Sequence, residues 1–586
     1  MFQPGRSLLE RLIKLGGKRD ESHLGRSALG AVLALSAGVA RAQTADAILF
    51  NGKIVTLDAK ASVVQALAIH DSRVLATGSN EQIEKLADAH TKRIDLDGRT
   101  VIPGLTDAHI HAIRAGLTFA TTLDWTGVAN IHDALKSIRE AALHSHPGQW
   151  IAVVGDWNKN QFAERRAPTP EELAQAAPNN PVYVQHLYDF AVLNSAALKA
   201  LNITAQTKVP PAGKVLLDAK SQPTGVIEAG GNVPTLARLY GRLPKATFAE
   251  EVKGTRAFFR TLNRFGVTGV IDEGGGGLFP ANYQPLFTVW RKGELTVRVR
   301  FDLMSQHRGK EFADLKDFTQ MLPPRFGDDK LRFLGLGEVP VWGMHDGALN
   351  VRKPFNPSPE AKKELLEIAS WAAQHGYTVH IHASSDHSAS QILDIFEEIN
   401  KTTPIAKLRW QIAHMEDASD DTLRRMKALG MGWAVQDRLY YGGEYIKSHD
   451  AKTLRRAPPI VTAMHMGLVV SGGTDAIAVS PYNPFLSLYW ELTGKTVGGS
   501  LTRARDELPS RVDALKTYTF NGAWMSFEEG QRGSLTPGKL ADLAVLDRDY
   551  LTVPVDDIAK TESLLTLLGG HAVYAAGPFA SLENNL

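Results

Sequence analysis

Eight short apolar runs, spaced through the middle of the chain and separated by helix-like stretches, constrain the fold most. Stretches such as Pro359–His375 carry the apolar spacing of an amphipathic helix. Alternating strands and helices predict a parallel sheet, and eight such units predict an α/β fold of the distorted TIM (β/α)8 barrel type. The predicted strands are Val101–His111, Val267–Glu273, Val297–Met304, Leu331–Val341, Tyr377–Ala383, Leu408–Met415, Met431–Gln436 and Leu468–Asp475.

The interval between the first and second predicted strands is much longer than one crossover helix requires. It contains strand-like runs of its own, Trp150–Gly155 and Pro181–Leu187. We therefore expect the barrel to span residues 101–524 and to carry an inserted subdomain at about 113–260.

Both ends of the chain carry short β-forming runs that are separated by turn residues. Asn51-Gly52 lies between two such runs, and Asp71-Ser72 separates Val63–Leu67 from Arg73–Thr77, so each pair predicts a hairpin. Similar runs return at Ala541–Asp547 and His571–Gly577. We expect residues 43–100 and 525–586 to form one small composite β-sandwich domain.

The N-terminal segment has the three parts of a secretory signal peptide. An uncharged run of 13 residues, Ala28–Ala40, follows Arg26 and precedes the small-residue pattern Ala40-Arg41-Ala42. We expect residues 1–42 to be a signal peptide and the protein to be periplasmic or secreted. The general and twin-arginine export routes both stay open. The alternative is a buried or amphipathic N-terminal helix.

Composition excludes several classes of function. The chain has no cysteine, so any metal must be held by His, Asp, Glu or a modified Lys. Lys and Arg number 65 against 63 Asp and Glu, which lacks the basic surplus of a nucleic-acid-binding protein. No apolar run approaches the ~20 residues of a membrane-spanning helix. A small-molecule substrate is the expected partner, and a homodimer is compatible with this composition.

Potential metal ligands stand where predicted barrel strands end, which is the edge that carries active sites in this fold. His109 and His111 are two residues apart on a strand and therefore share a face. Taken singly, a histidine could belong to the core, an aspartate could cap a helix and a glutamate could form a surface ion pair. Their coincidence at strand ends favours a metal site made of His109, His111, Glu338, His382, His414 and Asp475, with His380 as the alternative to His382.

These residues resemble the amidohydrolase superfamily, and within it the family 3, or YtcJ-like, branch. Pro103–His111 is similar to the opening motif PG-hhD-HxH, and His382–Asp386 is similar to HAxGD. The resemblance covers residues 45 to 586. It also includes Pro168–Leu173, Asn194–Leu198, Pro223–Glu228, Asn521–Ala523 and Gly533–Leu543.

The resemblance implies one or two divalent metal ions, zinc above all, held by the six residues named. Two positions depart from the pattern. Glu338 stands where the family has a carboxylated lysine, and its carboxylate could bridge two cations without that modification. Asp189 stands where the branch has a histidine, which predicts altered substrate recognition.

The implied reaction is hydrolysis of a non-peptide C–N bond, in an amide or cyclic amide, by metal-activated water. Asp475 would act as base and then as acid, and Asp386 would orient a ligand histidine. Ester or lactone hydrolysis at the same site, or a metal-poor binding protein, are the alternatives. Candidate substrate-binding residues on predicted loops are Trp157, His186, Trp342, Arg438 and Tyr440, with Tyr441 beside them.

Overall fold

The computed structural model describes residues 43–230, 232–347, 355–444 and 455–583. The predicted signal peptide, residues 1–42, lies outside the described residues. Among the helices of the described part, none is long and apolar enough to cross a membrane.

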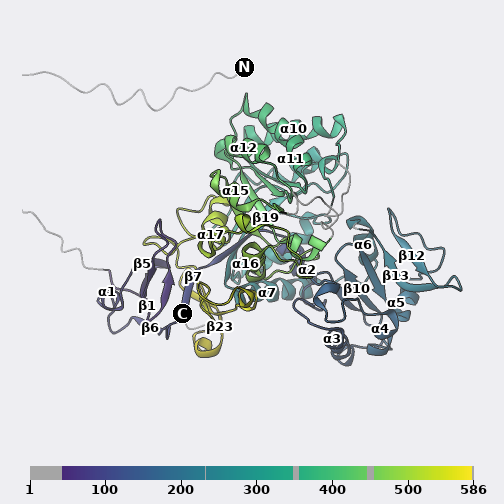
Figure 1. The fold of residues 1–586 in the computed structure, drawn as a ribbon, viewed down its shortest axis with the longest axis horizontal. Helices are drawn as coiled ribbons and strands as arrows, with labels where there is room; N and C mark the ends of the chain where they lie inside the picture. The colour runs from purple at the N-terminus through teal and green to yellow at the C-terminus, as the bar shows by residue number, and fades with distance from the viewer. Residues whose placement is uncertain (1–42, 231, 348–354, 445–454, 584–586) are drawn as a thin grey trace, which may run out of the picture. The chain divides into compact units, whose positions relative to one another are not determined.

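Eight parallel strands form the central sheet, as the sequence predicts (Figure 1). Neighbours in the sheet follow chain order from β8 to β20. Beyond the strand ends, Asp475 N donates to His109 O at 2.8 Å and His111 N donates to Ala476 O at 2.8 Å, so the last strand returns to the first. The strands are β8 (Leu105–Ile110), β14 (Val267–Asp272), β15 (Arg298–Leu303), β16 (Leu331–Leu336), β17 (Thr378–Ala383), β18 (Gln411–His414), β19 (Gly432–Gln436) and β20 (Val469–Gly473).

Helices follow the strands and cover the barrel, whose walls are buried throughout. α10 begins at the cap Ser358, whose hydroxyl accepts from Ala361 N, and ends at Gly376 with φ +77°. The helices around the barrel are α2 (Ala112–Thr118), α7 (Phe248–Arg264), α8 (Gln284–Arg291), α9 (Glu311–Thr319), α10 (Pro359–His375), α11 (Asp386–Asn400), α12 (Asp420–Ala428), α13 (Arg438–Gly442), α15 (Ile460–His465), α16 (Pro484–Thr493), α17 (Arg511–Thr517) and α18 (Phe520–Met525).

The predicted first strand, Val101–His111, is two strands in the structure. β7 (Thr100–Pro103) pairs with strands from both chain ends, and only β8 belongs to the barrel. The chain changes sheets at Gly104, where a Cβ atom would lie 2.2 Å from Thr268 Oγ1. The predicted fourth strand, Leu331–Val341, likewise ends earlier, at Leu336.

Two small sheets lie outside the barrel, in agreement with the predicted extra β domain, and the second of them joins strands from both ends of the chain. In Figure 1 the early strands are purple and β23 is yellow. The first sheet has the order β5-β4-β1-β6, and the second has the order β23-β22-β21-β7-β2-β3. Their bounds are β1 (Ala47–Phe50), β2 (Lys53–Val55), β3 (Val63–Val64), β4 (Ala66–His70), β5 (Arg73–Gly78), β6 (Lys92–Asp95), β21 (Leu543–Leu546), β22 (Ser563–Leu568) and β23 (His571–Ala575), with helix α1 (Asn80–Glu84).

The two predicted hairpins differ in outcome. β4 and β5 pair antiparallel around Asp71 and Ser72, which have φ +46° and +64°, as a type I′ turn requires. The hairpin at Asn51-Gly52 was a wrong prediction. β1 pairs with β4 and β6, whereas β2 pairs with β3 and β7, so the chain crosses between the sheets there. Both edges of β1 are already occupied, which leaves no place for β2.

An inserted subdomain follows α2, as expected, and has its own five-stranded sheet of order β12-β13-β11-β10-β9. Its apolar cores are separate from that of the barrel. Its elements, blue in Figure 1, are α3 (Ile131–Leu143), β9 (Ile151–Val154), α4 (Pro170–Ala176), β10 (Val182–His186), β11 (Phe190–Leu193), α5 (Ser195–Ala200), β12 (Lys214–Leu217), β13 (Pro223–Glu228) and α6 (Val233–Tyr240).

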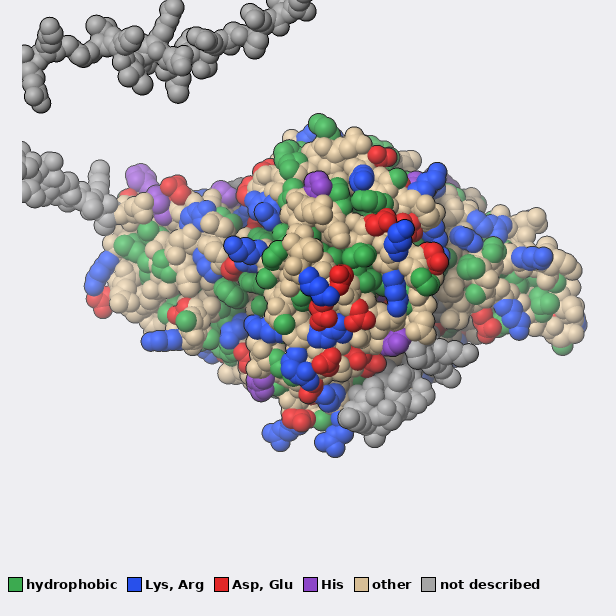
Figure 2. All heavy atoms as spheres, turned by 90° about the horizontal axis from the view of Figure 1, so that it is seen from above, with side chains coloured by type: hydrophobic (Ala, Val, Ile, Leu, Met, Phe, Trp, Pro, Cys, Tyr) green, Lys and Arg blue, Asp and Glu red, His purple; other side chains and the backbone are tan. Residues whose placement is uncertain are grey.

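Basic and acidic side chains are interspersed on the face of the molecule that Figure 2 shows. This distribution agrees with the near-zero net charge of +2.

Candidate metal centre

Glu338 lies among the four histidines that the sequence predicts as metal ligands. Its Oε1 atom is 2.7 Å from His382 Nδ1 and 2.9 Å from His414 Nε2. The same carboxylate reaches the first strand, with Oε2 3.6 Å from His111 Nε2 and Oε1 3.9 Å from His109 Nε2. The side chain therefore faces two pairs of imidazole nitrogens, one from β8 and one from β17 and β18.

Asp475 closes the same cluster from the end of β20. Its Oδ1 atom is 3.4 Å from His111 Nε2 and 3.6 Å from His109 Nε2, and its Oδ2 is 3.9 Å from His414 Nδ1. Asp475 and His414 both have positive φ, +56° and +72°. Such conformations are costly for residues other than glycine and concentrate at functional sites.

Asp107 fixes the first and last strands against each other. Its carboxylate accepts from His109 N at 3.2 Å, from Thr474 N at 3.0 Å and from the Thr474 hydroxyl at 2.6 Å. Burial raises the pKa of Asp107 to about 7. Because Thr474 precedes Asp475, this carboxyl group sets the spacing between Asp475 and His109.

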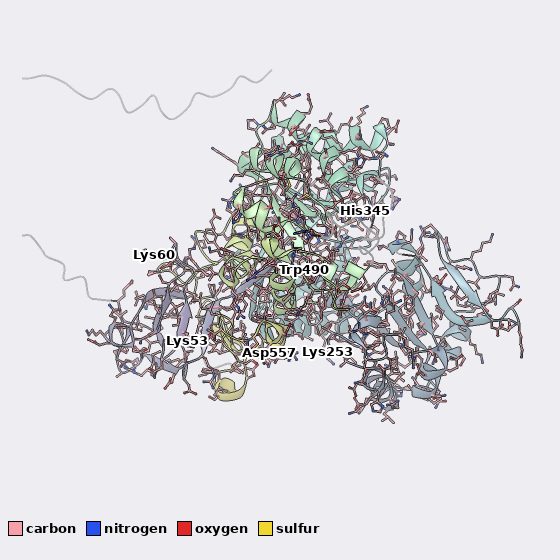
Figure 3. All side chains as sticks on the ribbon, in the orientation of Figure 1. Lys53, Lys60, Lys253, His345, Trp490 and Asp557 are labelled. Atoms are coloured by element: carbon pink, nitrogen blue, oxygen red, sulfur yellow. The ribbon has the colours of Figure 1, made fainter. Side chains whose placement is uncertain are left out.

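Two of the predicted ligand histidines have oxygen partners on the side facing away from Glu338. His111 Nδ1 contacts Gly274 O at 2.7 Å, and His382 Nε2 lies 2.9 Å from Asp346 Oδ1. His345, labelled in Figure 3, stacks on the His382 ring with centroids 4.2 Å apart. Partners of this kind fix the orientation and tautomer of a metal-ligating histidine.

The pKa values of the histidines and of Glu338 are shifted because these ionisable side chains are buried close together. Burial opposes protonation of His382, but Asp346 and Glu338 raise its pKa to about 10. Burial lowers the pKa of His109 to about 4. Although burial opposes ionisation of Glu338, its bonds to His382 and His414 hold its pKa well below the usual value. The carboxylate is therefore ionised at neutral pH.

The donor set fits a divalent cation. His109 Nε2 and His414 Nδ1 are buried and have no hydrogen-bond partner within the described part of the chain. His109, Glu338 and His414 offer ligand atoms within 4.8 Å of one another, and so do His109, His111 and Asp475. Imidazole and carboxylate ligands in these numbers suit zinc, and a group of three protein ligands leaves a position for water or substrate.

Two predicted substrate-binding residues lie near this cluster. Arg438 is buried, with Nε 3.8 Å from Asp475 Oδ2 and Nη2 3.1 Å from Glu416 Oε1. Burial raises the pKa of Glu416 to about 7. Trp342 is half-buried in the segment between Glu338 and His345, and its buried Nε1 has no partner among the described residues.

The structure places the other predicted substrate-binding residues elsewhere. Trp157 lies in the core of the insert, fully buried, with Nε1 donating to Gln185 O at 2.7 Å. His186 packs beside it, stacked on Phe190. Tyr440 packs at the edge of the barrel core beside Tyr441, whose hydroxyl donates to Asp156 O. Trp157, which was expected on a loop, is a core residue because the insert has a sheet and an apolar core of its own.

Asp386 does not contact a histidine in the structure. Its carboxylate accepts from Ser419 N at 2.7 Å, and its own N–H donates to Asp417 Oδ1 at 2.6 Å. Asp346 takes the position that was expected for it, against His382. No pattern in the sequence around Asp346 indicated this, because the contact depends on how the segment after β16 folds back over β17.

Comparison with known proteins identifies the group to which this arrangement belongs. The model of the amidohydrolase family matches residues 92–574. The chain belongs to the amidohydrolase family. Membership makes it a metal-dependent hydrolase acting on carbon–nitrogen bonds other than peptide bonds.

Individual amidohydrolases resemble the chain over nearly its whole length. The N-substituted formamide deformylase of Arthrobacter pascens is 24% identical over 550 residues, covering 91% of this chain and 99% of that protein. The YtcJ protein of Bacillus subtilis is 23% identical over 562 residues, covering 90% and 99%. An uncharacterized metal-dependent hydrolase from Pyrococcus horikoshii shares the fold, with a TM-score of 0.63, 24% identity and coverage of 87% and 99%.

Proposed function

We propose that this amidohydrolase binds one or two zinc ions and hydrolyses an amide or cyclic amide of a small molecule. The proposed ligands are His109, His111, Glu338, His382, His414 and Asp475. The observation that supports the proposal most is the position of Glu338, whose two oxygens face histidines from opposite walls of the barrel. That position suits a carboxylate bridge between two cations.

The proposed reaction needs a Lewis acid and a group that transfers a proton, and Asp475 is the proposed proton-transfer group. When bound, a divalent cation supplies Lewis acidity, which lowers the pKa of water from 15.7 to about 7 and polarises a substrate carbonyl. The bonds of Asp475 to His109 and His111 outweigh its burial and hold its pKa well below the usual value, so it is ionised. It can accept a proton from the attacking water and return it to the leaving nitrogen.

Arg438 and Trp342 are the proposed substrate contacts. The Arg438 guanidinium, beside Asp475, can hydrogen-bond an oxygen of the substrate while Glu416 and Ser384 hold its other end. The indole N–H of Trp342 has no partner among described residues and can donate to a polar group of the substrate. The Arg308 guanidinium lies over the indole ring, 4.9 Å from its centroid, so the proposal assigns an aromatic or cyclic substituent to the other face.

The proposal also includes export. We propose that residues 1–42 direct the protein to the periplasm or the exterior, because they carry the charged, apolar and small-residue parts of a signal peptide. The N-terminal sequence of the protein recovered from a periplasmic fraction tests this. A mature chain that begins at Gln43 is the expected result, and an intact N-terminus in the cytoplasm would contradict it.

The test of function is reconstitution with a panel of substrates. The full chain is stripped with a chelator, reloaded with zinc, and assayed against N-substituted formamides, cyclic amides, and esters or lactones of matched shape. We expect hydrolysis of one amide class, lost on stripping and restored on reloading. A preference for esters would shift the substrate class, and tight zinc binding without hydrolysis of any panel member would argue against the proposed amide substrates.

A further inference from the structure

A second histidine of β17 lies behind the metal centre rather than in it. His380 is two residues before His382 and points to the same side of the strand, yet its ring contacts His109 instead of Glu338. His380 Nε2 is 3.2 Å from His109 Nδ1, and His380 Nδ1 is 2.6 Å from Glu273 Oε1. His109, His380 and Glu273 have no exposed surface.

We propose that Glu273 and His380 form a relay that positions His109 for metal binding. The inference rests on the proposed function, because it takes His109 as a ligand. His380 Nε2 faces His109 and His380 Nδ1 lies against Glu273, although the 2.6 Å contact with Glu273 does not have the angles of a hydrogen bond. In the relay His380 is therefore a positioning residue and not a ligand. The chain of contacts runs from the metal side of His109, through two imidazoles, to the buried carboxyl group of Glu273, whose pKa burial raises well above its usual value.

The proton positions follow from the contacts. His109 Nε2 faces Glu338 and Asp475 and must keep its lone pair free for a cation. Its proton is then on Nδ1 and is donated to His380 Nε2. His380 must in turn hold its own proton on Nδ1, which faces the carboxylate of Glu273. Each ring therefore has one tautomer, set by the acceptor behind it.

The relay differs from the partners of the other ligand histidines. His111 is held by a backbone carbonyl and His382 directly by Asp346. For His109 the carboxyl group stands one imidazole further away, on Glu273, which follows β14. Outer carboxylates raise the basicity of the ligand they orient, and their loss typically weakens metal affinity by about 10–100-fold.

Zinc affinity of the full chain, measured by competition with a chromogenic chelator, tests the relay. In His380→Phe the ring shape is retained but the acceptor is lost, and we expect affinity to fall by about 10–100-fold. In His380→Gln an amide oxygen can accept from His109 Nδ1, and we expect most of the loss to be recovered. Glu273→Gln should give an intermediate loss.

Matched controls separate the relay from general damage to the core. His186→Gln replaces a histidine that is equally buried in the insert, and Glu491→Gln replaces a buried glutamate that bonds Thr517 at a distance from the metal centre. Neither control should change zinc affinity. Because His380 and Glu273 act in series, the double variant H380F/E273Q should bind zinc no more weakly than H380F alone.

The protonation of the rings gives a second measurement that does not need metal. With ¹⁵N-labelled histidine, the signals of His109 and His380 can be assigned by their loss in His109→Asn and His380→Gln. We expect both rings to carry the proton on Nδ1 in the metal-free and zinc-loaded protein. In His380→Phe the His109 ring proton should lose its hydrogen-bonded downfield shift and exchange faster with solvent.

Three results would overturn the relay: parental zinc affinity in His380→Phe, a His109 proton on Nε2 in the metal-free protein, or the loss of one bound ion per chain in Glu273→Gln. The last result would make Glu273 and His380 ligands of a second cation with His109, since those three residues also offer clustered ligand atoms. A parent chain that binds no zinc would contradict the proposed function. In that case the positions of the ring protons of His109 and His380 in the metal-free protein would still show whether the relay exists.

Discussion

The Glu338 Oε1 atom lies 2.9 Å from His414 Nε2, just beyond the end of β16. A carboxylate there needs no modification to bind metal, but its charge is essential. In Glu338→Gln a single neutral amide oxygen cannot bridge two cations. We expect bound zinc, measured by plasma mass spectrometry, to fall from near two ions per chain to one or none.

The activity of Glu338→Gln should fall with the metal, by at least about 100-fold in kcat/KM, since even outer-sphere partners are worth 10–100-fold. Glu491→Gln is the control for replacing a buried glutamate by glutamine and should keep the parental zinc content. A variant that retains every ion of the parent would show that Glu338 does not bridge.

Replacing Asp475 separates proton transfer from folding. Asp475→Asn keeps the shape of the side chain but cannot accept the proton of water, so we expect kcat to fall by about 10²–10⁴-fold. The matched control is Asp386→Asn, because the carboxylate of Asp386 accepts a hydrogen bond from the backbone N–H of Ser419. Steady-state kinetics at saturating zinc make the comparison. Equal losses in the two variants would remove Asp475 from the proton-transfer role.

Two tryptophans that looked alike in the sequence should behave in opposite ways. Trp342 is half-buried, with its ring centroid 6.3 Å from that of His345, which stacks on the proposed ligand His382, so Trp342→Ala should raise KM with little change in unfolding. Trp157 fills the core of the insert, so Trp157→Ala should cost about 3–5 kcal/mol of unfolding free energy. Urea unfolding and substrate-saturation curves measure both. A larger KM effect at Trp157 than at Trp342 would reverse the assignment.

The sequence predicted the barrel well because alternating apolar runs and helices allow few arrangements. It also brought together the six proposed ligands, because parallel strands of a barrel all end at one edge. It failed where a contact depends on the path of a loop. Asn51-Gly52 has the composition of a hairpin turn, but the edges of β1 are taken by β4 and β6. Asp346 and Glu273 lie far in the sequence from the histidines that they contact, which no local pattern reveals.

The opposite end of the barrel should govern acid stability. Glu528 is buried between Arg300, whose Nη2 lies 2.6 Å from Oε1, and Arg532, whose Nε lies 2.9 Å from Oε2. Although burial opposes ionisation, Arg532 and Arg300 hold the pKa of Glu528 well below its usual 4.5. Glu528→Gln leaves two buried cations without a counter-charge, and we expect it to cost about 3–5 kcal/mol at neutral pH.

The dependence of that cost on pH gives the sharper test. A carboxylate with a depressed pKa in the folded protein stabilises it above the unfolded-state pKa, and this contribution is lost as pH falls toward the folded-state value. The difference in unfolding free energy between parent and Glu528→Gln should therefore shrink below about pH 4.5, by up to ~1.4 kcal/mol per pH unit. Asp329→Asn, at an exposed partner of Arg298, should cost at most about 1 kcal/mol. Urea unfolding from pH 7 to pH 3 measures all three proteins, and parallel curves for parent and Glu528→Gln would refute the role of this ion pair.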